Sequence, residues 1–181
     1  EQIQEFLKQG VNDEDVEELK HLDTGIAHNP ISNLRLGCKI ADTTKYTRNN
    51  INVALGTDGQ GSGNNLDMFE ALKTACLIQG GIHENEDRLT SKEAIKMATI
   101  NGAKLLKLDD KVGSIEEGKD ADIILVDISQ NLDNITKLPN NDIISNLVYN
   151  TCGRDVCTTI IKGNILMEDR KLKSMDIDEV I

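Results

Sequence analysis

The segment GTDGQGSGNN, residues 56–65, holds the residues best suited to chemistry. A mostly apolar run, residues 51–58, ends in Asp58. In parallel α/β architectures reactive groups lie where strands end and loops begin. A carboxylate at such a point can bind a divalent metal or accept a proton from a bound water. The spacing leaves open a second interpretation, in which Asp58 only starts a turn or caps the next helix.

Glycines alternate with other residues after Asp58, which lets the backbone approach a ligand closely. Neither of the glycine-rich phosphate-binding patterns, G-x-G-x-x-G or G-x-x-x-x-G-K-[ST], occurs, so phosphate binding is disfavoured.

Histidines are the other candidate ligands, but His21, His28 and His83 show no paired spacing. A catalytic zinc usually needs three protein ligands and one open position, so this sequence does not supply a complete site. His28 ends the apolar run 24–28 and can be a ligand, a base or a structural residue. We expect His21 and His83 to face solvent. The four cysteines are widely spread, and we expect buried thiols rather than a metal site.

Two halves must position these residues. Residues 1–107 alternate short apolar runs with helical patterns, which predicts a parallel sheet with helical connections. Residues 108–181 read as a small β unit. The expected elements are strands at 24–28 and 51–58, helices through Val16–Leu19 (capped by Asn12 or Asp13), through 66–76 and from the capping box Thr90–Glu93 to Leu106, then a strand at 123–128, a loop at 129–142 and a hairpin of 156–161 with 165–167.

Composition narrows the class of protein. Of 181 residues, 38% are hydrophobic, which is enough for a packed core. The net charge of −11 argues against nucleic acid as a partner, because phosphate binding needs clustered cations. No run of 18 apolar residues occurs, so we expect no membrane contact, and the lack of a signal-like start favours a cytoplasmic protein.

Four stretches carry a family resemblance: HNPISNLRLGCKIA (28–41), NVALGTDGQGSGNNLDMFE (52–70), ATINGAKLLKLDDKVGSIEEGKDADIILVD (98–127) and GNILMEDRKL (163–172). They resemble the amidohydrolase superfamily, most closely its S-adenosylhomocysteine, 5′-methylthioadenosine and 5′-deoxyadenosine deaminases. Chlorohydrolases of the atrazine and ethylammeline type share much of the pattern.

The resemblance implies an α/β fold, in which 1–107 form the last strands and helices of a (β/α)8 TIM barrel and 108–181 belong to a small β-sandwich. It implies that Asp58 ligates one divalent metal (zinc, with iron or manganese as alternatives), contacts substrate and relays protons. Ser62 would lie near the nucleoside, and His28 would line the substrate pocket without ligating the metal.

The implied activity is hydrolytic deamination of adenosine-type nucleosides to inosine analogues and ammonia, by a protein that can be a homo-oligomer. A triazine- or guanine-type amidohydrolase or chlorohydrolase is the alternative substrate class. A truncated, non-catalytic chain is the alternative of another kind.

The sequence departs from the family in lacking its H-x-H pair, its strand-five and strand-six histidines and its catalytic glutamate. A barrel of this kind needs about 250 residues. Residues 1–10 resemble the helix after barrel strand five, and 11–28 resemble the segment after strand six, so the strand between them is missing. We expect a longer protein of which this is part, rather than an internal deletion, because half a barrel would expose apolar strand faces.

Overall fold

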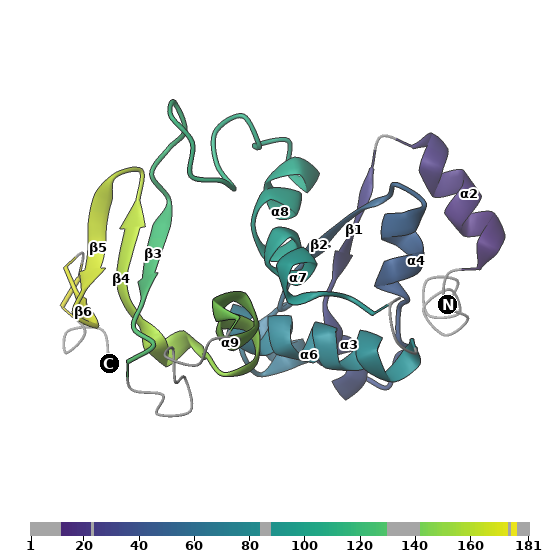
Figure 1. Cartoon of the computed structure of the whole chain (residues 1–181), viewed down its shortest axis with the longest axis horizontal. Coiled ribbons are helices and arrows are strands. Elements are labelled where there is room, and N and C mark those ends of the chain that lie inside the picture. The colour runs from purple at the N-terminus through teal and green to yellow at the C-terminus, as the bar shows by residue number, and fades with distance from the viewer. Residues whose placement is uncertain (1–11, 23, 84–87, 130–141, 174, 177–181) are drawn as a thin grey trace.

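The computed structural model describes residues 12–22, 24–83, 88–129, 142–173 and 175–176 (Figure 1). The elements in chain order are α2 (Asp13–His21), β1 (Gly25–His28), α3 (Pro30–Arg35), α4 (Thr43–Arg48), β2 (Asn52–Leu55), α5 (Gln60–Gly63), α6 (Met68–Ile82), α7 (Ser91–Ala98), α8 (Ile100–Leu105), β3 (Ile123–Val126), α9 (Ile143–Tyr149), η2 (Gly153–Asp155), β4 (Val156–Ile161), β5 (Asn164–Glu168) and β6 (Lys171–Leu172). The predictions for residues 1–11 and for most of the loop 129–142 fall outside the described residues.

The first half contains the predicted parallel pair of strands. β1 pairs with β2 from Gly25 opposite Asn52 to His28 opposite Leu55, and helices α3 and α4 connect the two strands. β2 is shorter than the predicted 51–58, because the chain leaves the sheet after Leu55. Since the strands are parallel, their carboxyl ends lie at one edge, and Asp58 follows at that edge.

The core lies between β2 and the helices that follow it. Val53 of β2 and Ala71 of α6 are fully buried, and Met97 of α7 is nearly so. Paired amides hold α8 on β2: Asn101 Nδ2 donates to the carbonyl of Val53 at 3.0 Å, and Asn52 Nδ2 donates to the carbonyl of Asn101 at 3.0 Å. Helices α7 and α8 thus pack against β2, and α6 packs against α7 (Figure 1).

Helix starts follow the predicted capping chemistry, with two corrections. The capping box predicted at Thr90 is confirmed, and Asn12, one of the two residues predicted to cap the first helix, is its N-cap and also forms a capping box. The helix predicted from Leu66 begins only after Asp67, whose side chain accepts from the Phe69 N–H, and Leu66 itself is 58% exposed. The helix predicted after Thr90 breaks at Thr99 into α7 and α8.

A four-stranded antiparallel sheet, in the order β3-β4-β5-β6, forms the second half. The predicted hairpin is confirmed, and its turn places Lys162 and Gly163 at positive φ. The described part of this half contains this one sheet, so the second layer of the expected β-sandwich stays a prediction. The halves touch where the Gly153 N–H donates to Asp67 Oδ2 at 2.7 Å.

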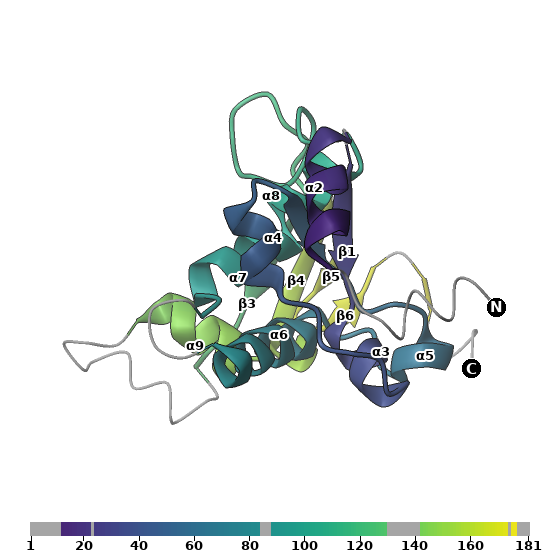
Figure 2. The ribbon, with the colours of Figure 1, turned by 90° about the vertical axis from the view of Figure 1, so that its right-hand side faces the viewer.

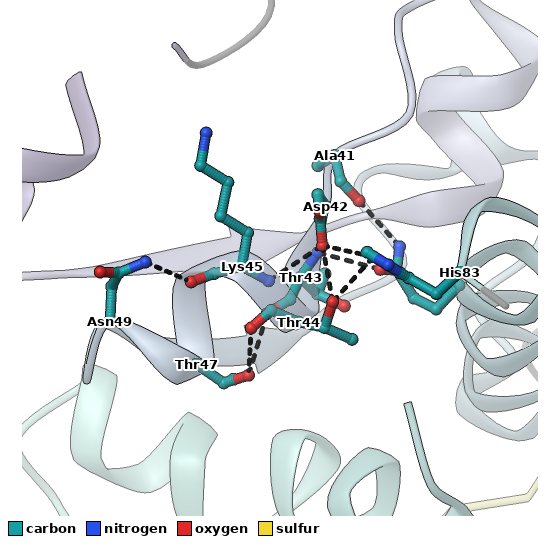
Figure 3. Close-up of polar contacts among 9 residues, drawn as sticks. Ala41, Asp42, Thr43, Thr44, Lys45, Thr47, Asn49 and His83 are labelled. Carbon is teal, nitrogen blue, oxygen red and sulfur yellow. Dashed lines mark hydrogen bonds and ion pairs between the residues drawn. The ribbon is translucent and has the colours of Figure 1, made fainter. Parts of the chain in front are cut away.

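The prediction that His83 faces solvent is wrong. Its Nε2 lies 2.8 Å from Asp42 Oδ1 and 2.8 Å from Thr44 Oγ1 (Figure 3). Nearby, buried Gln79 accepts from the Thr43 N–H and donates to a carbonyl of the segment before α4. This polar cluster ties the start of α4 to the end of α6. His21, by contrast, is exposed as predicted.

The expectation of buried thiols holds for one cysteine. Cys76 is buried, whereas Cys38 and Cys157 are half-buried and Cys152 is exposed; all four are free. Cys152 is exposed because it precedes the short helix η2 at the surface. None of the helices in the described part of the chain has the length and apolar character needed to cross a bilayer.

Candidate active site

Asp58 lies three residues beyond β2, in a turn that holds it at the edge of the sheet. The Gly56 N–H donates to the carbonyl of His28 at 2.9 Å, and the chain then turns away. Asp58 adopts φ 60°, a left-handed conformation that aspartate tolerates better than most residues. Its N–H donates to Asn29 Oδ1 at 3.1 Å, which ties this turn to the end of β1.

The Asp58 carboxylate accepts a hydrogen bond at each oxygen. Ser32 Oγ donates to Oδ2 at 2.7 Å, and the Gly59 N–H donates to Oδ1 at 2.6 Å. The Ser32 bond is the largest cause of a lowered pKa at Asp58, followed by the Gly59 bond, and the Ser62 hydroxyl adds a smaller effect. Asp58 is therefore an exposed, ionised carboxylate at neutral pH.

Asp58 does not cap the helix that follows it. The N-cap residue of α5 is Gly59, and no side chain caps that helix. The interpretation of Asp58 as a helix cap is therefore wrong, and its carboxylate oxygens keep unused lone pairs, since a carboxylate has about four acceptor positions.

Ser62 lies beside Asp58. It sits on α5, which packs beside α3 (Figure 2). Its hydroxyl helps to lower the pKa of Asp58, and its carbonyl accepts from Arg35 Nη1 at 3.3 Å. The structure therefore brings Asp58 and Ser62 together at the carboxyl edge of the strand pair.

His28 points into the interior. Only 3% of it is exposed, and neither ring nitrogen has a hydrogen-bond partner among the described residues. Burial lowers the pKa of His28 to about 4, so the imidazole is neutral at physiological pH. The His28 ring is not among the hydrogen-bond partners of the Asp58 side chain, which are Ser32, Gly59 and Ser62.

The Asp58 carboxylate is suited to serve as one ligand of a metal site. Asp58 is ionised and exposed, which suits a divalent cation. Within the described ranges, no group of three or more His, Cys, Asp or Glu side chains comes together to hold a metal ion. Asp58 therefore fits as a single ligand, and the rest of a ligand set is not found in this part of the chain.

The resemblance places residues 28–33 in a loop that lines the pocket, but sequence reasoning gave Asn29 and Ser32 no individual role, and both contact Asp58. Asn29-Pro30 reads as a turn, and Ser32 as a possible cap, yet α3 starts at Pro30. A favourable N-cap residue followed by proline at the first helical position is a known helix start, so the signal was present. The contact of Ser32 with Asp58, 26 residues away, has no local signal.

Comparisons with known proteins identify the family of the chain. The sequence model of the Amidohydrolase family matches residues 6–166. A 5-methylthioadenosine/S-adenosylhomocysteine deaminase of Acetivibrio thermocellus is 44% identical over 94% of this chain and 38% of its own length. A 5′-deoxyadenosine deaminase of Methanobrevibacter smithii is 44% identical over 92% of this chain and 38% of its own length.

Among solved structures, an adenosine deaminase from Xanthomonas campestris with bound zinc superposes with a TM-score of 0.85 at 30% identity. The match covers 96% of this chain and 38% of that one. This chain thus spans less than half the length of the relatives it matches. Its mixed α/β fold agrees with the TIM-barrel type that these relatives imply. On the strength of the family match over most of its length, the chain belongs to the amidohydrolase family.

Proposed function

We propose that this chain contributes the Asp58 side of the active site in a metal-dependent hydrolase that deaminates adenosine-type nucleosides. The substrates are 5′-deoxyadenosine, 5′-methylthioadenosine and S-adenosylhomocysteine, and the products are the inosine analogues and ammonia. One observation carries the proposal: an ionised, exposed carboxylate stands at the carboxyl edge of a parallel strand pair. Relatives named as deaminases of these nucleosides match nearly the whole chain.

Asp58 has two tasks in this proposal. Its unused lone pairs ligate one divalent metal, with zinc preferred and iron or manganese as alternatives. When bound, such an ion lowers the pKa of a coordinated water to near neutrality. The ionised Asp58 accepts a proton from the attacking water, and the departing amino group leaves C6 as ammonia once it is protonated. One water is consumed for each ammonia released.

Ser62 and His28 complete the substrate side. Ser62 lies next to Asp58, so its hydroxyl is placed to hydrogen-bond a nucleoside held at that carboxylate. We assign His28, which is buried and neutral at the end of β1, to the wall of the full-length pocket and not to the metal. We assign residues 1–107 to the barrel and 108–181 to a β-sandwich, of which the sheet β3–β6 is one layer.

Replacement of Asp58 by Asn tests the proposal in the protein at its full natural length. Ammonia release from the three nucleosides should fall by about 10²- to 10⁴-fold, the usual contribution of a general acid–base group. D110N, which changes an exposed aspartate after α8, is the matched control and should keep full activity. Undiminished deamination by D58N would remove Asp58 from the mechanism.

The same assay separates the alternatives. Turnover of guanine or a chlorotriazine in preference to the nucleosides would replace the substrate class while keeping the family. A non-catalytic chain is the remaining alternative, because the described residues hold only one ligand. The intact mass of the protein from its natural source decides this point: about 20 kDa favours the non-catalytic chain, and more than about 40 kDa, the size of a full barrel with a second domain, removes it.

A further inference from the structure

Ser32 is a buried hydroxyl with one evident partner. It is the third residue of α3, is 1% exposed, and donates from Oγ to Asp58 Oδ2 at 2.7 Å. Hydrogen bonds from a neutral donor to a carboxylate are stronger than those between neutral groups. The bond joins the loop after β1 to the loop after β2, and so holds the Asp58 carboxylate from the side of α3.

The Asn29 side chain holds Asp58 as well, by a hydrogen bond to its backbone N–H. It is the N-cap residue of α3, but its side chain makes no capping bond to that helix. Instead, Asn29 Oδ1 accepts from the Asp58 N–H at 3.1 Å. A side chain on Gly56 would collide with that same oxygen, so the chain after β2 passes directly against Asn29. A capping group of α3 is thus used to hold Asp58 in its left-handed conformation.

We propose that Ser32 is a positioning residue for Asp58. It fixes the rotamer of the carboxylate so that the unused lone pairs face the open side of the turn, where a metal ion and the attacking water would be held. The inference rests on the proposed function, since it assigns Ser32 a role only through Asp58. Groups that orient a metal ligand typically contribute 10- to 100-fold to metal affinity or activity.

The test measures zinc affinity and steady-state kinetics in the full-length protein. S32A should raise the zinc dissociation constant by about 10- to 100-fold, determined by competition with a chelator. It should lower kcat while leaving KM unchanged, because the substrate contacts remain. S32T keeps the hydroxyl and should restore both values. S32G also lacks the hydroxyl and adds no metal-binding group, so it should behave as S32A and gives a second variant if S32A folds poorly.

T151V is the matched control, because Thr151 is also buried and its hydroxyl bonds a helix carbonyl in the other half. It should bind zinc as the wild type does. Wild-type zinc affinity in both S32A and S32G, alongside a loss in D58A, would overturn the role of Ser32 alone. Wild-type affinity in D58A itself would instead overturn the proposed function, so the two failures are distinguishable.

Discussion

Buried His28 should make the stability of the protein depend on pH. The folded-state pKa of about 4 lies below the value of about 6.5 that histidine has in an unfolded chain. Between these values His28 is protonated in the unfolded chain but neutral in the folded protein. The free energy of unfolding therefore falls as the pH drops from about 6.5 to about 4. At 1.36 kcal/mol per pKa unit, the full loss is about 3 kcal/mol, and about 2 kcal/mol of it has occurred by pH 5.

The assay is urea unfolding of the wild type and of H28N at pH 7.5 and at pH 5. Asparagine cannot be protonated, so H28N should lack this part of the pH dependence whatever its stability at pH 7.5. Between the two pH values the wild type should lose about 2 kcal/mol more than H28N. H21N, which removes an exposed histidine, should retain the wild-type loss. Equal losses in the wild type and H28N would refute the burial of a neutral imidazole.

Two further predictions concern the scaffold that carries Asp58. Gly25→Ala should destabilise the protein by about 1–3 kcal/mol in urea unfolding, because the added Cβ would lie 2.5 Å from the Asn52 carbonyl and 2.8 Å from Leu105 Cδ1. The control is Gly80→Ala in α6, where an added Cβ meets no atom within 4 Å, and this change should stabilise the protein by about 0.5–1 kcal/mol. A similar effect at both sites would contradict the close packing of α8 on β1. Thr90→Ala removes one side of a capping box and should cost about 1 kcal/mol in the same assay, whereas an unchanged midpoint would mean that the start of α7 does not limit stability.

Sequence periodicity identified the strands but not their ends. The apolar run 51–58 marks β2 correctly, yet only residues opposite β1 are paired, and β1 is four residues long. The end of a strand is therefore set by the length of the strand it pairs with. The local sequence pattern of one strand carries no information about that neighbouring strand. The same holds for His83: its charged neighbourhood in the sequence suggests solvent, whereas its environment comes from Asp42, 41 residues away.

The candidate site shows the same division. Asp58 and His28 were singled out by their places at the ends of apolar runs, and the family resemblance then gave them roles. Ser62 was predicted from the resemblance alone. Ser32 and Asn29 belong to the loop that the resemblance places at the pocket, but their contacts with Asp58 were not predicted, because Asn-Pro suits both a turn and a helix start. Their importance lies in contacts that span 26 and 29 residues, and such contacts exist only once β1 and β2 are side by side.

The contacts that hold Asp58 all arise from two neighbouring loops. Asn29 and Ser32 follow β1, and Gly59 and Ser62 follow β2. Because β1 and β2 are held in register by their own pairing, the carboxylate is oriented before any ligand from elsewhere is added. A group that is already oriented needs no reorganisation when charge develops beside it, which is the main source of electrostatic catalysis. Under the proposed function, these two loops would hold Asp58 ready for metal binding and proton transfer.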